Sequence, residues 1–144
     1  RDNARTPYQW DGTLYAGFST AKPWLRVNPN HTEVNAAREL CDPDSVLNFF
    51  RRAVTLRKGH PDLVYGSFRL VDAANPQVFA YLREGTGRNY LPVLNFSPKA
   101  ARFDPKTDLT EAMPLLHNYP APPIAEKEGP IELRPYEGIL YRLA

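Results

Sequence analysis

The sequence is short of the features that would assign it to several broad classes of protein. Its single cysteine, Cys41, cannot form an internal disulfide and favours a reducing compartment. The formal net charge is only +2, which gives no reason to expect nucleic acid or an anionic membrane as a partner. No apolar run approaches the roughly 18 residues of a membrane span, and no signal peptide is visible. We therefore expect a cytoplasmic protein that binds neither nucleic acid nor membrane.

Most short motifs that carry chemistry are also missing. The sequence has no glycine-rich nucleotide loop, no Gly-x-Ser-x-Gly and no His-Glu-x-x-His. Its three histidines, His31, His60 and His117, lie far apart and lack the spacing of metal ligands. We interpret them as surface or capping residues and Cys41 as an inert thiol. The sequence predicts no metal site and no cofactor.

Paired carboxylates receive closer attention, because glycoside hydrolysis uses two of them. Asp42 and Asp44 are explained by the capping of a helix that follows them. Asp2 and Asp11 lie in the opening segment without a partner. No acid and nucleophile pair can be assembled from these residues, so no residue of this chain is predicted to be catalytic.

Prolines and aromatic residues, by contrast, are abundant. The 15 prolines are about twice the usual share of roughly 5%, and aromatic side chains make up 12% of the chain. Through residues 1–40, prolines and glycines interrupt every periodic pattern. This part nevertheless carries five aromatic side chains: Tyr8, Trp10, Tyr15, Phe18 and Trp24. The composition predicts a long ordered loop that lies on another part of a protein.

One amphipathic helix is marked over residues 42–58. Asp42 is expected as the N-cap and Pro43 as the first helical residue, and Gly59 follows the last turn. Apolar residues recur at helical spacing between these signals. A lone helix cannot bury such a stripe by itself, so the helix and the loop before it look like the end of a preceding domain.

Short strands separated by turn signals dominate the rest of the chain. Strands are expected over residues 63–71, 77–84, 90–96, 100–103, 114–118, 131–133 and 138–143. Pro92 is expected to mark an edge position or a bulge, because proline has no N–H for a ladder. The fold class is therefore mainly β, with an antiparallel β-sandwich over 62–144 preceded by the long loop and single helix of 1–61.

Several segments together carry a family resemblance over essentially the whole chain. "RDNARTPYQWD", "AGFST", "PWLRVNPN", "DPDSVLNFFRRAVTLRK" and "LRPYEGILY" resemble the C-terminal end of oligo-1,6-glucosidases and related α-glucosidases. These enzymes belong to the α-amylase superfamily, glycoside hydrolase family thirteen. The first motif is specific, and Tyr8 stands where the family usually has Met.

The resemblance implies a division of the chain. Residues 1–61 would be the end of a (β/α)8 catalytic barrel, and residues 62–144 would be the antiparallel C-domain. We expect the chain to be the C-terminal part of a longer retaining α-glucosidase that hydrolyses α-1,6 or α-1,4 bonds of short oligosaccharides. The partners would be the oligosaccharide substrate and the catalytic barrel.

The same resemblance separates what this chain supplies from what it lacks. The family's nucleophile, acid/base and transition-state stabiliser come from barrel strands that precede this region, so the chain alone is expected to be inactive. Arg1 matches the family arginine that contacts the non-reducing-end glucose in the −1 subsite. Its role would be to position substrate rather than to transfer a proton.

Three alternatives stay open at this point. The chain could be the same part of a sucrose isomerase, which shares much of this region, or of a trehalose synthase, although Asn3-Ala4 favours the glucosidases over the trehalose synthases. It could be an independent carbohydrate-binding module that uses Tyr119 or Tyr136. It could also be a packing partner in an oligomer, which predicts an exposed apolar patch around Phe49 and Phe50.

Overall fold

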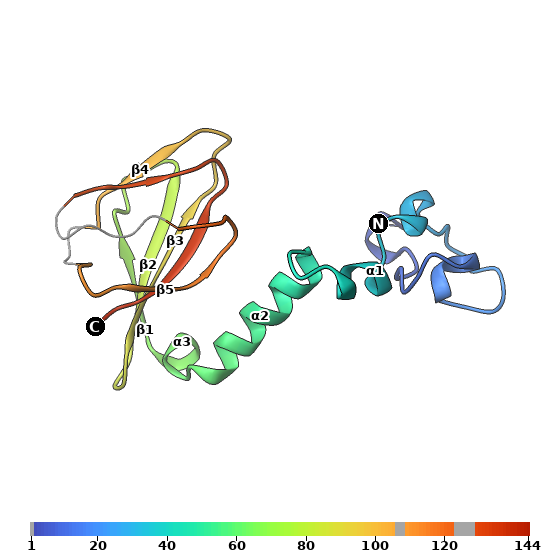
Figure 1. The fold of residues 1–144 in the computed structure, drawn as a ribbon, viewed down its shortest axis with the longest axis horizontal. Coiled ribbons are helices and arrows are strands. Elements are labelled where there is room, and N and C mark those ends of the chain that lie inside the picture. The colour runs from blue at the N-terminus through green and yellow to red at the C-terminus, as the bar shows by residue number, and fades with distance from the viewer. Residues whose placement is uncertain (1, 106–108, 123–128) are drawn as a thin grey trace. The chain divides into compact units, whose positions relative to one another are not determined.

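The structure, a computed structural model, describes residues 2–105, 109–122 and 129–144 (Figure 1). Contacts along the chain divide it into a first unit that ends at Ala53 and a second unit that begins at Val54. Within the described ranges, no helix is long and apolar enough to cross a membrane. The domain boundary expected between residues 61 and 62 stays a prediction.

The first unit contains short helical segments where the sequence predicts only an ordered loop. Three of these are 3-10 turns: η1 (Asp2–Arg5), η2 (Leu14–Gly17) and η3 (Pro29–Thr32). A short α-helix follows, α1 (Ala36–Cys41), and the Asn35 side chain caps it by accepting a hydrogen bond from the Arg38 amide at 3.0 Å. At six residues, α1 is too short to show a periodic apolar pattern, which is why the sequence does not reveal it.

The long helix α2 (Val46–Gly59) begins at a different cap from the one predicted. The Asp42 carboxylate accepts the backbone N–H of Asp44 at 2.9 Å and so forms a turn before the helix. The Ser45 hydroxyl accepts the Asn48 amide at 3.1 Å, which is the contact of a true N-cap. The prediction of Asp42 as N-cap was therefore wrong, because a proline-containing turn separates it from the first helical residue.

The strand predicted over residues 63–71 was wrong in its first half. That stretch forms a single helical turn, α3 (Asp62–Tyr65), in which the Tyr65 amide donates to the Pro61 carbonyl at 2.9 Å. The strand itself, β1, runs only over Ser67–Val71. Pro61 is favourable near the start of a helix, and this local signal outweighs the apolar run that follows it.

The second unit is an antiparallel β-sandwich, as the sequence predicts. Five strands form one sheet in the order β1-β2-β3-β7-β5, and two strands form a second sheet in the order β4-β6 (Figure 1). The remaining strands are β2 (Val78–Glu84), β3 (Asn89–Asn95), β4 (Ala101–Phe103), β5 (Met113–His117), β6 (Ile131–Leu133) and β7 (Gly138–Arg142). Each of these six lies within two residues of its predicted bounds.

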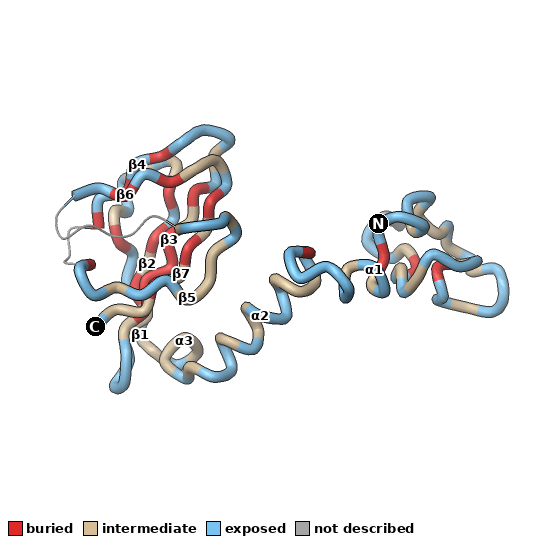
Figure 2. Tube along the Cα trace, in the orientation of Figure 1, coloured by how far each residue is buried: buried red, intermediate tan, exposed pale blue. Residues whose placement is uncertain are grey.

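The hydrophobic core lies wholly in the second unit, between the two sheets (Figure 2). Alternate strand residues enter it, so β2 contributes Val78, Ala80 and Leu82 while the residues between them face outward. Phe103 from β4 and Tyr141 from β7, which belong to different sheets, are both fully buried. In the described part of the first unit, by contrast, Ala16 is the one aliphatic or aromatic residue, prolines aside, that is buried.

Pro92 lies in a central strand, although an edge position or a bulge was expected. It is buried in β3, which lies between β2 and β7 and is not an edge strand. Its Cα is paired with Leu140 of β7, but the pairing between β2 and β3 lapses at Pro92 and resumes at Tyr90 without a shift in register. The expectation of an edge position or bulge was wrong, because the central ladder omits two successive residue pairs, at Pro92 and Leu91, where the proline N–H is missing.

Candidate functional site

The residue predicted to contact substrate, Arg1, lies outside the described residues. Its role therefore stays a prediction, and the candidate site is described from the residues that follow it. Residues 6–35 of the first unit are ordered by hydrogen bonds rather than by an apolar core.

Gln9 is the organising residue of this segment. Its side-chain amide donates to the backbone carbonyl of Val34 and to the Asn30 side chain, and its carbonyl oxygen accepts from the Asn28 amide at 3.3 Å. Its backbone carbonyl also accepts the Ala36 amide at 2.9 Å. Residues 19 to 27 positions further along the chain are thereby fixed against Gln9. Gln9 lies in the first motif of the family resemblance, but this role was not predicted, because only long-range contacts reveal it.

The aromatic side chains of the segment are ordered but strongly exposed. Tyr8 and Trp10 form an edge-to-face pair with ring centroids 4.6 Å apart, and Arg5 lies 5.7 Å from the centroid of the Trp24 ring. Trp10 is nevertheless 56% exposed and Trp24 is 85% exposed. Large aromatic rings gain most of their stabilisation from burial. Their arrangement therefore fits a surface that is completed by another part of a protein or by a ligand.

A strained turn follows this pair. Tyr15, Ala16 and Gly17 all have left-handed backbone angles, with φ values of 57°, 59° and 65°. Such angles are costly for tyrosine and alanine, and consecutive examples persist only where the surroundings fix them. The turn is held by the Asp11 carboxylate, which accepts from both the hydroxyl and the amide of Thr13. These two hydrogen bonds hold the pKa of Asp11 below its usual value.

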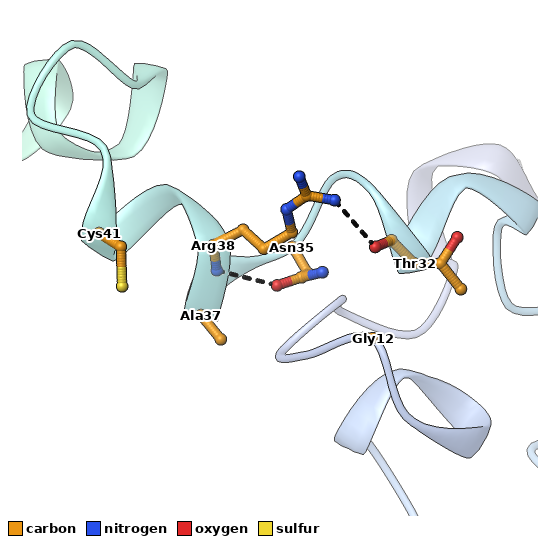
Figure 3. Close-up of a pocket in the computed structure, with 6 residues that line it drawn as sticks. All are labelled: Gly12, Thr32, Asn35, Ala37, Arg38 and Cys41. Atoms are coloured by element: carbon orange, nitrogen blue, oxygen red, sulfur yellow. Dashed lines mark hydrogen bonds between the residues drawn. The ribbon is translucent and has the colours of Figure 1, made fainter.

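An open hollow of about 470 Å³ lies beside helix α1, next to Gly12 and Thr32 (Figure 3). Its lining consists of Gly12, Thr32, Asn35, Ala37, Arg38 and Cys41. The polar groups here already serve the fold, because the Arg38 guanidinium donates to the Thr32 carbonyl at 3.3 Å and Asn35 caps α1 (Figure 3). No carboxylate lines the hollow, so it cannot provide an acid and a nucleophile for glycoside hydrolysis.

Each of the three histidines contacts a backbone carbonyl, but only His60 caps a helix, at the end of α2, whereas His31 lies within η3 and His117 lies within β5. The Nδ1 atoms of His31, His60 and His117 lie 3.0, 2.7 and 2.6 Å from backbone carbonyls, to which they can donate. Cys41 is exposed and unpaired. Among the described residues, no group of three or more His, Cys, Asp or Glu side chains could hold a metal ion.

A polar network in the second unit was not predicted. The Glu137 carboxylate is 1% exposed and accepts hydrogen bonds from the backbone amide and guanidinium of Arg134. That guanidinium also stacks 4.3 Å from the centroid of Tyr119, whose hydroxyl donates to the Pro135 carbonyl at 2.9 Å. The i, i+3 spacing of Arg134 and Glu137 was the available sequence signal. The network fixes the loop that leads into β7 and has a structural role.

Comparison with known proteins gives a family match in each half of the chain. Residues 1–66 match the alpha amylase catalytic domain, and residues 68–140 match the maltogenic amylase C-terminal domain. The chain is 39% identical to an oligo-1,6-glucosidase of Bacillus cereus and 43% identical to a probable oligo-1,6-glucosidase of Bacillus subtilis, covering 99% of this chain in both cases. It spans about a quarter of the length of these relatives, 26% and 25%.

Solved structures show the same fold. A trehalulose synthase matches with a TM-score of 0.88 and 43% identity, and an isomaltulose synthase from Klebsiella sp. LX3 matches with a TM-score of 0.86 and 35% identity. Both alignments cover 99% of this chain and 26% of the other. The agreement extends over the aromatic segment, the helix and the sandwich together.

Proposed function

This chain belongs to the maltogenic amylase C-terminal domain family within the α-amylase superfamily, and we propose that it is the C-terminal part of a retaining, exo-acting α-glucosidase. The substrate class is short oligosaccharides with α-1,6 or α-1,4 glucosidic bonds. The observation that carries the proposal is the alignment of 99% of the chain with oligo-1,6-glucosidases at 39% and 43% identity. The catalytic domain match over residues 1–66 supports a direct connection to the catalytic machinery.

The chain's own share of the work is positioning and bracing. Arg1 carries the proposed contact with the non-reducing-end glucose, where a guanidinium can donate to two neighbouring oxygen atoms. By the family resemblance, the nucleophile and the acid/base carboxylate would come from barrel strands that precede this region. The second unit, with its closed core, supplies a rigid C-domain.

Isomerisation of sucrose is the second candidate, because the trehalulose and isomaltulose synthases align as fully as the glucosidases do. Both outcomes require the same retaining chemistry, in which a glycosyl group is transferred either to water or to another sugar hydroxyl. The residues of this chain discussed above do not distinguish hydrolysis from isomerisation.

An independent sugar-binding module receives less support from the structure. Of the two aromatic residues considered for it, Tyr119 is engaged by Arg134 and by the Pro135 carbonyl. Tyr136 is 60% exposed, and no aromatic ring within the described ranges pairs with it. Sugar platforms gain affinity from several aligned aromatic faces, so one ring is a weak basis for a binding module.

The test compares two proteins on two substrates. The protein that carries the catalytic domain should release glucose from isomaltose or a nitrophenyl α-glucoside, and its action on sucrose should yield hydrolysis products rather than isomers. The 144-residue chain by itself should give no turnover above buffer. Turnover by the chain alone, or rearrangement of sucrose as the dominant reaction, would contradict the proposal. A cytoplasmic location rests on the single cysteine and is proposed on that ground only.

A further inference from the structure

One glutamine side chain anchors the segment that follows Arg1. Gln9 is half-buried, and its amide group uses both of its N–H donors and its carbonyl oxygen. The donors bond to the Val34 carbonyl and the Asn30 side chain, and the oxygen accepts from Asn28. A charged side chain cannot supply two donors and an acceptor from one such group, and asparagine is one methylene shorter. The position therefore requires glutamine.

Asn28 extends this anchor toward the beginning of the segment. Its side-chain amide donates to the Gln9 oxygen at 3.3 Å and to the Thr6 hydroxyl at 3.4 Å. Thr6 directly follows η1, the turn that leads from Arg1 into the described segment. The side chains of Gln9 and Asn28 thus connect the end of η1 to residues 28–34.

Backbone hydrogen bonds join the same segment to the start of α1. The Ala36 and Ala37 amides lie in the first turn of the helix, where an amide has no acceptor within the helix itself. They donate to the Gln9 and Trp10 carbonyls at 2.9 Å each. These bonds hold the main chain at residues 9–10, while the position of Thr6 depends on side chains. The hydrophobic core lies in the second unit and offers this segment no substitute for them.

We propose that Gln9 is a positioning residue for the substrate contact of Arg1. Its hydrogen bonds keep residues 6–9 in one conformation and thereby direct the chain that leads back to Arg1. Gln9 acts through Arg1 and is not itself placed against the sugar. A small misplacement caused by a change far from the reacting atoms can cost a factor of about a hundred in rate. The inference rests on the proposed function and deepens it, because it requires that Arg1 bind the substrate.

The test measures kcat and KM on a nitrophenyl α-glucoside with the protein that carries the catalytic domain. Gln9→Ala should lower kcat/KM by about tenfold to a hundredfold. Gln9→Glu keeps an oxygen that accepts from Asn28 but loses both donors, so its kcat/KM should lie between those of Gln9→Ala and the parent. The same change is then made in an Arg1→Ala background. There Gln9→Ala should cost less than about twofold, because the contact that it positions is already gone.

Gln77→Ala is the matched control. The Gln77 amide also donates to a distant side chain, the Ser97 hydroxyl at 3.1 Å, but it lies in the second unit. Its replacement should leave kcat/KM unchanged. Should Gln9→Ala fold poorly, as judged by tryptophan fluorescence, the comparison between the two backgrounds is made with Gln9→Glu.

Two results would overturn the positioning role of Gln9. One is an equal loss of kcat/KM in the parent and Arg1→Ala backgrounds, which would leave Gln9 with a structural role alone. The other is parent-like activity of both Gln9 variants. In either case the parent protein still turns over the glucoside, so the proposed function stands. A parent protein without turnover would instead contradict the proposed function, and with it the inference that depends on it.

Discussion

At the scale of single residues, the buried carboxylate of Glu137 makes an acid-sensitive contribution to stability. Burial acts to raise its pKa, but the hydrogen bonds from the Arg134 side chain and amide outweigh burial and hold the pKa below its usual value. A carboxyl whose folded-state pKa is lowered stabilises the fold above its unfolded-state pKa. This contribution disappears as the pH falls through the lower, folded-state pKa.

Glu137→Gln should therefore destabilise the second unit by about 1–3 kcal/mol at neutral pH, because charged hydrogen bonds to Arg134 are lost. The difference from the parent chain should shrink as the pH is lowered below about 4. Urea unfolding followed by far-ultraviolet circular dichroism at several pH values measures both effects. Glu84→Gln is the control, because its pair with Arg69 is exposed and its removal should change stability little. A Glu137→Gln difference that stays constant down to pH 3 would contradict the assignment.

Gly17 lies in the strained turn, and tryptophan fluorescence can measure the effect of replacing it. Gly17 has a φ of 65°, and a Cβ there would lie 2.5 Å from an Asp11 carboxylate oxygen. Both effects oppose a side chain, so Gly17→Ala should destabilise the strained turn by about 1–3 kcal/mol. The only tryptophans, Trp10 and Trp24, both lie in the first unit, so the denaturant midpoint of tryptophan fluorescence reports this change.

Gly59 supplies the comparison for this experiment. A Cβ at Gly59 meets nothing within 4 Å, and its backbone lies at the end of helix α2. Gly59→Ala should leave the tryptophan transition unchanged and raise helix content slightly, since alanine favours helix by up to about 1 kcal/mol. Equal behaviour of the two variants would show that the Asp11 contact does not constrain the turn.

At the scale of elements, the start of α2 allows a direct comparison of two candidate caps. The Ser45 hydroxyl accepts from Asn48 and donates to the Glu39 carbonyl at 2.7 Å, so it joins α2 to the end of α1. Ser45→Ala should lower stability of the helix by about 1 kcal/mol. The helical signal in circular dichroism during thermal unfolding measures the loss. Asp42→Ala, which removes the carboxylate that accepts the Asp44 amide in the preceding turn, should have the smaller effect. The reverse order would restore Asp42 as the cap.

The elements also show which features the sequence could and could not specify. The strands of the sandwich were predictable because alternating apolar residues and turn signals are local, as in Val78–Glu84. The cap at Ser45 was missed because Asp42 and Pro43 form an equally good local start signal that the turn then uses. Pro92 was misplaced because its neighbours across the sheet, which tolerate the missing N–H, are not visible in its own segment. The substrate contact at Arg1 was predicted from a motif alone and stays a prediction.

At the scale of the whole molecule, the two units differ in how they are stabilised. Every residue of the hydrophobic core cluster lies between Val71 and Tyr141, in the second unit. The first unit relies on Gln9 and on backbone hydrogen bonds, while its large aromatics stay exposed. Buried apolar surface is the dominant source of stability in folded proteins, and exposed hydrogen bonds add little net free energy.

Unfolding of the 144-residue chain should therefore occur in two steps. Tryptophan fluorescence, which reports the first unit, should change at a lower denaturant concentration than the β-sheet signal of circular dichroism, which reports the second. In the protein that carries the catalytic domain, burial of Trp10 and Trp24 should move the first transition upward until the two coincide or nearly so. Coincident transitions in the chain alone would mean that the first unit is stable without a neighbour. In that case the exposed aromatic segment would need a different explanation from the one offered by a glucosidase catalytic domain.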